Sequence, residues 1–203
     1  MKQTTLLLFL LLNLNAAVLK ASDSSSVIGK SMSDFALMST SGKLVSLADY
    51  PQAKGFIIVF TCNHCPFAKL YSKRFNEMNE KYSALGFPLL AINSMDTVIY
   101  EEESFEKMRQ KAQSQKFNFP YLQDQMQQVG KQFNAEHTPQ SFVIAKENDR
   151  WIVKYSGAID DNGAEPKKIK NAYVTEAVNA LLNGKEILNP QTSTFGCAIF
   201  YRK

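Results

Sequence analysis

Residues 55–71 read GFIIVFTCNHCPFAKLY and place two cysteines directly after an apolar segment. The segment 55–61 is rich in β-branched and aromatic residues and is apolar on both faces, which is typical of a buried strand in a sheet covered by helices. After Pro66, apolar residues recur at spacings of three and four, which predicts an amphipathic helix. Cys62 and Cys65 therefore lie where a predicted buried strand passes into a predicted helix.

A C-x-x-C pair is either a redox centre or one half of a zinc site. A zinc site needs further ligands, and the remaining cysteine and histidine candidates are His64, His137 and Cys197. The position favours a redox pair, because free backbone N–H groups at a helix N-terminus stabilise a thiolate near neutral pH. We therefore predict that Cys62 is the nucleophile and that Cys65 is the resolving thiol.

The residues between the two cysteines are expected to tune the reduction potential, since whatever stabilises the Cys62 thiolate makes the disulfide more oxidising. His64 acts in that direction if it is protonated or donates a hydrogen bond to the thiolate. The alternative is that His64 is only an exposed loop residue.

The rest of the chain alternates predicted strands and helices. The helix after Pro66 is predicted to end near Gly86. We further predict an N-terminal hairpin at 35–47, a buried strand at 87–92, helices at 105–112 and 125–133, a second hairpin at 141–155 and a last helix at 172–182. Alternating elements followed by a hairpin predict an α/β fold with a mixed sheet flanked by helices.

The segment FTCNHCPFAKLY, together with His137, Thr138 and Pro139, resembles the thioredoxin superfamily. In that superfamily a Thr-Pro dipeptide before a late strand carries a cis-proline that faces the active cysteines, and here SFVIA follows Pro139 immediately. The resemblance implies that the backbone at Thr138 pairs with an extended substrate segment in the mixed disulfide. A trans-proline that begins an ordinary strand is the alternative.

Most of the chain, from Val27 to Cys197, resembles the redoxin branch of that superfamily, the alkyl hydroperoxide reductase and thiol-specific antioxidant group. The matching segments are IGKSMSDFALMSTSGKLVSLADY, AINSMD, FPYLQDQ and YSGAIDD. The chain is similar to exported thioredoxin-family proteins with a CxHCP motif. This resemblance implies a thioredoxin-like fold, with a central mixed β-sheet flanked by helices and an N-terminal β-hairpin extension.

Two alternative functions stay open. Peroxiredoxins carry a threonine three residues before the peroxidatic cysteine and a proline further upstream, whereas Cys62 and Ile58 take those positions relative to Cys65. This departure argues against a thiol peroxidase. Cys62, Cys65 and His137 could instead hold Cu(I), which prefers thiolate and imidazole ligands. Thioredoxin-fold copper carriers, however, generally space their cysteines by three residues.

The first residues predict export. Met1-Lys2 is a short positive start, 6–14 is an apolar run and small residues follow, so we interpret 1–21 as a secretory signal peptide, 22–26 as a polar leader and 27–203 as the redoxin domain. The run is shorter than the roughly 20 residues of a spanning helix, which makes a membrane anchor the weaker alternative. We expect a periplasmic or secreted protein without a stable membrane span.

The composition limits the partners and cofactors. A net charge of +4 on 203 residues is too weak to argue for nucleic acid, and the sequence has no evident nicotinamide or flavin motif. We therefore expect no bound cofactor or resident metal, and we expect a separate redox partner protein. Three cysteines are too few for a disulfide scaffold. We interpret Cys197 as a buried small apolar side chain, with a third redox thiol or a dimer link as alternatives.

The predicted activity is thiol–disulfide exchange with protein disulfide or dithiol substrates. The histidine between the cysteines favours an oxidant, and the redoxin-like body favours a reductant. Between these two directions we prefer the reductant.

Overall fold

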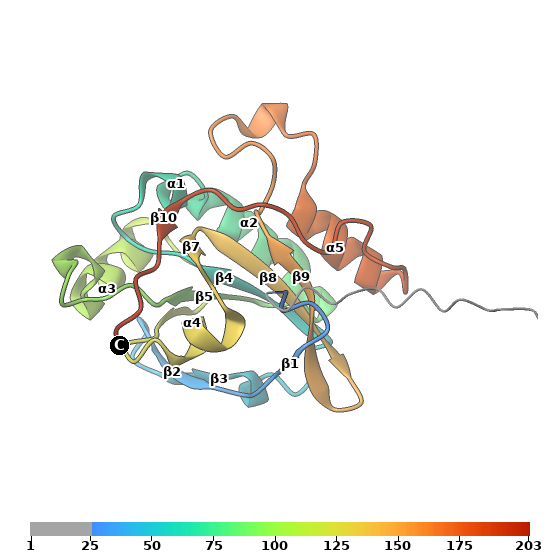
Figure 1. Ribbon diagram of the computed structural model, residues 1–203, viewed down its shortest axis with the longest axis horizontal. Coiled ribbons are helices and arrows are strands. Elements are labelled where there is room, and N and C mark those ends of the chain that lie inside the picture. The colour runs from blue at the N-terminus through green and yellow to red at the C-terminus, as the bar shows by residue number, and fades with distance from the viewer. Residues whose placement is uncertain (1–25) are drawn as a thin grey trace, which may run out of the picture.

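An eight-stranded sheet forms the centre of the protein, with the strand order β1-β9-β8-β4-β5-β6-β2-β3 (Figure 1). The computed structural model describes residues 26–203. The predicted signal peptide, 1–21, and residues 22–25 of the predicted leader lie outside this described part.

The sheet is mixed, as predicted. Its centre holds the parallel strands β4 (Gly55–Phe60), β5 (Leu89–Asn93) and β6 (Tyr121–Gln123), and β8 (Gln140–Glu147) runs antiparallel to β4. The outer strands are β9 (Arg150–Gly157), β1 (Ser31–Met32), β2 (Ala36–Ser39) and β3 (Leu44–Ser46). Strands β2 and β3 form the predicted N-terminal hairpin, and β8 and β9 form the second one. All six residues of β4 are buried, which confirms the expected strand covered on both faces.

Helices cover both faces of this sheet. One face packs against α2 (Ser72–Tyr82), α3 (Phe105–Ser114) and α5 (Tyr173–Leu182), and the other packs against α4 (Gln128–Phe133). The remaining helical segments are α1 (Pro66–Lys69) and the 3₁₀ turns Leu47–Asp49, Ser83–Leu85, Glu101–Glu103 and Pro166–Lys168. Within residues 26–203, no helix combines the length and the apolar character that crossing a membrane requires.

Two predicted helices differ from the structure. The single helix after Pro66 is divided into α1 and α2, because the N–H groups of Leu70 and Tyr71 bond to carbonyls three residues back and tighten the chain there. Helix α4 starts at Gln128 instead of 125. The preceding residue, Gln127, has a φ of +56°, outside the helical range.

A second, two-stranded sheet joins β7 (His137–Thr138) to β10 (Cys197–Ala198). After α5 the chain returns past β7 as a tail, drawn in red in Figure 1. The tail ends beside α4, where the Tyr201 hydroxyl donates a hydrogen bond to the carbonyl of Ala135 at 2.5 Å. Strands β7 and β10 have two residues each, too few for an alternating hydrophobic pattern that would predict a strand from the sequence.

Candidate active site

Cys62 and Cys65 lie in the loop between β4 and α1. Strand β4 ends at Phe60 and α1 begins at Pro66, so Cys65 caps the helix and Cys62 lies three residues further upstream. Pro66 occupies the first helical turn, where a missing N–H costs little. Both cysteines are free thiols with no exposed surface.

Thr138 and Pro139 face the cysteine pair. The peptide bond between them is cis, as the resemblance implied. The Sγ atom of Cys62 lies 3.1 Å from the hydroxyl oxygen of Thr138, and the Cys65 thiol donates to the Thr138 carbonyl at 3.1 Å. The structure therefore brings the two predicted thiols to one face of the predicted Thr-Pro dipeptide.

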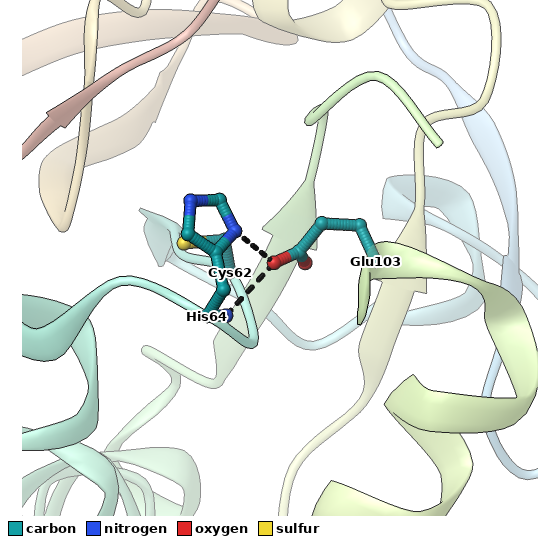
Figure 2. A group of neighbouring side chains, drawn as sticks. All are labelled: Cys62, His64 and Glu103. Atoms are coloured by element: carbon teal, nitrogen blue, oxygen red, sulfur yellow. Dashed lines mark hydrogen bonds and ion pairs between the residues drawn. The ribbon is translucent and has the colours of Figure 1, made fainter. Parts of the chain in front are cut away.

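A buried carboxylate, Glu103, lies beside the cysteine loop (Figure 2). It accepts hydrogen bonds from the backbone N–H groups of Asn63 and His64 at 2.8 Å. It also accepts from the His64 ring nitrogen Nδ1 and from the Asn93 amide, each at 2.6 Å. The N–H groups that could have faced a Cys62 thiolate therefore point at a carboxylate.

The His64 ring is held in place and is only partly exposed. Its Nδ1 bonds to Glu103, and the ring stacks on Tyr100 with centroids 4.6 Å apart. A quarter of the side-chain surface is exposed. The alternative of a free loop residue is therefore wrong, and the hydrogen bond of Nδ1 goes to the carboxylate instead of a thiolate.

Three more side chains fix the cysteine loop. The Lys111 ammonium, from α3, donates to the carbonyl of Cys62 at 2.6 Å, and burial lowers the pKa of this lysine. The Tyr121 hydroxyl donates to the Asn63 side chain at 3.0 Å, and the Asn63 amide donates to the Glu102 carbonyl at 2.7 Å. The loop is thus held from α3, from β6 and from the segment before α3.

The two thiols affect each other's acidity. A hydrogen bond with Cys65 raises the pKa of Cys62, and burial and the charge of Glu103 act in the same direction. The same bond lowers the pKa of Cys65 to about 4, with help from the Cys197 thiol. The prediction that backbone N–H groups stabilise a Cys62 thiolate differs from the structure, where the N–H groups of Asn63 and His64 bind Glu103.

Cys197 is not the buried apolar side chain that the sequence suggested. It is partly exposed, and its carbonyl accepts a hydrogen bond from the Thr138 hydroxyl at 3.5 Å. Strand β10 places Cys197 directly opposite Thr138 in the pairing with β7. All three cysteines of the chain therefore meet at this site.

One group of possible metal ligands lies in the part of the chain described here. A Cys62 sulfur, a His64 nitrogen and a Glu103 oxygen lie within 4.8 Å of one another (Figure 2). The ligands of the copper alternative, Cys62, Cys65 and His137, form no such group among residues 26–203. The Nδ1 atom of His137 instead lies 3.1 Å from the Thr194 hydroxyl.

Glu103 and Lys111 are functional candidates that the sequence did not reveal. Glu103 is the last of three consecutive glutamates, and nothing in that run marks one of them as buried. Lys111 lies among the other polar residues of an amphipathic helix. Their proximity to the loop depends on how α3 packs against the sheet, and no local pattern reports this.

The AhpC/TSA family model matches residues 28–155, more than half of the chain. The chain belongs to the AhpC/TSA family. Membership of this redoxin family implies thiol-based oxidoreductase or peroxidase chemistry in general. Among curated proteins, none matches the sequence.

Solved structures show the same fold for this AhpC/TSA protein. A hypothetical protein from Sinorhizobium meliloti is 30% identical, with a TM-score of 0.78, over 86% of this chain and 94% of its own. An uncharacterised conserved protein from Geobacillus kaustophilus is 31% identical, with the same TM-score, over 86% and 92%. The exposed lipoprotein thioredoxin of Streptococcus pneumoniae is 16% identical, with a TM-score of 0.56, over 75% and 99%. The fold is therefore thioredoxin-like, as predicted.

Proposed function

We propose that this protein is a thiol–disulfide oxidoreductase that acts on protein disulfides, with Cys62 and Cys65 as its working pair. The observation that carries the proposal is the convergence of two buried free thiols on Thr138, each with its sulfur 3.1 Å from one oxygen atom of that residue. Two free thiols three residues apart that contact the same residue are placed to close to a disulfide.

The proposed reaction has two exchange steps. Cys62 first passes its proton to the neighbouring Cys65 thiolate, and the Cys62 thiolate then attacks a substrate disulfide, which forms a mixed disulfide and releases one substrate thiolate. The Cys65 thiolate then attacks the Cys62 sulfur, so that the Cys62–Cys65 disulfide forms and the second substrate thiolate leaves. The substrate gains two electrons, and the cysteine pair loses them. The proton on Cys65 passes to the first substrate thiolate released, which leaves Cys65 as the thiolate for the second step.

The surroundings of Cys62 support a reductant. A group that stabilises the thiolate of the reduced pair makes the disulfide more oxidising, and a group that destabilises it has the opposite effect. The Glu103 charge raises the pKa of Cys62 and therefore disfavours its thiolate, whereas the lowered pKa of Cys65 acts in the opposite direction. The bond between His64 and Glu103 also removes one donor that could have stabilised it.

An apolar groove beside the cis-proline supports a protein substrate. The groove has a volume of about 480 Å³ and is lined by Pro139 and by the side chains of Phe67, Leu70 and Phe195. These three side chains are exposed by 46 to 77%. Apolar surface of this kind next to a reactive centre is typical of a protein-binding surface.

Export and a separate redox partner complete the proposal. The segment 1–21 has the charge, apolar run and small residues of a signal peptide. The pneumococcal neighbour is itself an exposed lipoprotein thioredoxin. N-terminal sequencing of the protein from the periplasm or medium should begin at Ser22. An uncleaved chain retained in the cytoplasm would contradict this location.

A trapping experiment tests the function. The Cys65→Ser variant, mixed with insulin, should accumulate a mixed disulfide at Cys62, since the resolving thiol is absent. The unchanged protein, supplied with dithiothreitol, should reduce insulin catalytically and should consume hydrogen peroxide slowly. Fast peroxide consumption without insulin reduction would instead support the peroxidase alternative.

A further inference from the structure

The C-terminal tail occupies the strand position next to the cis-proline. Strand β10 pairs with β7 in an antiparallel register that sets Cys197 opposite Thr138. This is the backbone edge that the thioredoxin resemblance assigns to an extended substrate segment. The chain thus fills its own substrate position and brings a third thiol there.

The tail is built to lie close to this edge. Gly196 contacts the carbonyl of Thr138 so tightly that a Cβ atom would overlap the carbonyl oxygen. On the C-terminal side, the Ile199 N–H donates to the Glu136 carbonyl at 2.8 Å. On the N-terminal side, the Thr192 hydroxyl accepts from the Ala158 N–H at 3.0 Å. These contacts hold Cys197 beside the cysteine pair from both sides.

The three thiols differ in their access to solvent. Cys62 and Cys65 have no exposed surface, whereas Cys197 is partly exposed. All three cysteines contact Thr138, Cys62 and Cys65 through their sulfur atoms and Cys197 through its carbonyl, and Cys65 and Cys197 shift each other's pKa. In this arrangement a disulfide that includes Cys197 therefore exposes more of its surface to a partner thiol than the buried Cys62–Cys65 disulfide does.

We propose that Cys197 is a third thiol of the redox cycle, which exchanges with the Cys62–Cys65 disulfide and brings it to the surface. The inference rests on the proposed function of that pair. The Cys197 thiolate attacks the Cys65 sulfur, the Cys65–Cys197 bond forms, and the Cys62–Cys65 bond breaks. The electron pair goes to Cys62, which takes the proton lost by Cys197. The step moves a disulfide and changes no oxidation level.

The dithiol of the redox partner then completes the cycle. One partner thiolate attacks the Cys197 sulfur, Cys65 leaves, and the second partner thiol closes the partner disulfide and releases Cys197. A thiol with a low pKa leaves faster, and the pKa of Cys65 is about 4. The pKa of Cys197 is raised to about 11 by burial and by the hydrogen bond and the charge of Cys65. Cys65 carries no charge while it is in a disulfide, so this contribution to the pKa of Cys197 is then absent.

Disulfide mapping in two variants of the full chain tests the inference. After oxidation with oxidised glutathione, the Cys62→Ser variant should form an intramolecular Cys65–Cys197 disulfide, seen by mass mapping of unreduced peptides. The Cys197→Ser variant should form Cys62–Cys65. Oxidised unchanged protein should contain both bonds.

The two variants separate the two proposals. The role of Cys197 would be overturned, and the proposed function kept, if Cys62→Ser formed glutathione adducts or intermolecular dimers without a Cys65–Cys197 bond while Cys197→Ser formed a normal Cys62–Cys65 bond. The same conclusion follows if Cys62→Ser does not fold and the unchanged protein contains only Cys62–Cys65. Absence of the Cys62–Cys65 bond in Cys197→Ser would overturn the proposed function itself.

A backbone variant tests the position of the tail. Gly196→Ala should push the tail away from Thr138, so that alkylation of Cys65 accelerates on the order of tenfold, the factor that corresponds to about 1.4 kcal/mol. The control Ser193→Ala changes an exposed tail residue and should leave the rate unchanged. Equal rates in all three proteins would show that the tail does not hold Cys197 at this site.

Discussion

Glu103→Gln removes the negative charge beside Cys62 and should lower the pKa of that thiol. The Glu103 oxygen and the Cys62 sulfur are both buried and lie within 4.8 Å of each other. At an effective dielectric constant of about 20, two unit charges at this separation repel by about 3.5 kcal/mol. One pKa unit corresponds to about 1.4 kcal/mol, so the pKa of Cys62 should fall by about 2.5 units.

The assay measures alkylation against pH in a chain whose only thiol is Cys62. Cys65→Ser and Cys197→Ser remove the other two thiols, and iodoacetamide then reports the Cys62 thiolate. Because the Glu103 charge raises the pKa of Cys62, the alkylation rate should rise at a lower pH in the Glu103→Gln variant than in the chain that keeps the glutamate. The midpoint is compared instead of the rate, because burial slows alkylation equally in both proteins.

A neighbouring residue supplies the control for this experiment. Glu102→Gln removes an exposed carboxylate one residue away and should leave the alkylation midpoint unchanged. Circular dichroism checks that Glu103→Gln still folds, since it replaces an acceptor of several buried hydrogen bonds. A midpoint that stays in place or moves to higher pH in folded Glu103→Gln would refute the electrostatic reasoning.

Two further changes follow from the same packing. Lys111→Met removes the ammonium group that donates to the Cys62 carbonyl, and with it a positive charge close to the Cys62 thiolate. The alkylation midpoint of Cys62 should therefore move to higher pH, and the exposed control Lys107→Met should leave it unchanged. Asp160→Ala removes the carboxylate that pairs with the Arg74 guanidinium, whose side chain is only 11% exposed. The free energy of unfolding, measured with urea, should fall by about 3–5 kcal/mol. A loss below about 1 kcal/mol, typical of an exposed pair, would contradict the buried character of this ion pair.

The sequence predicts the parts of the fold that local patterns control. The run 55–61 is apolar on both faces, and it forms the buried central strand. The hairpin turn at Asn148 and Asp149 was marked by polar residues, and both adopt positive φ angles there. By contrast, the helix is interrupted near Tyr71, between α1 and α2, although the spacing of apolar residues stays helical through this point. The pattern therefore predicted one continuous helix.

The candidate site was only partly predictable, because its chemistry depends on contacts between distant segments. The C-x-x-C spacing and the Thr-Pro dipeptide identified Cys62, Cys65 and Thr138. Glu103 reaches the loop from a segment about forty residues later, as the separation of 39 residues from His64 shows. Cys197 arrives through β10, a strand of only two residues. No local period reports either contact.

The central claim is that Cys62 and Cys65 form a reversible redox pair, and its reduction potential is the most direct test. The Cys197→Ser chain is equilibrated in glutathione buffers, and free thiols are counted by mass. We predict one reversible two-electron transition that maps to Cys62 and Cys65, nearer to the roughly −270 mV of thioredoxin than to the roughly −120 mV of a strong oxidant. No reversible transition between these thiols would contradict the account.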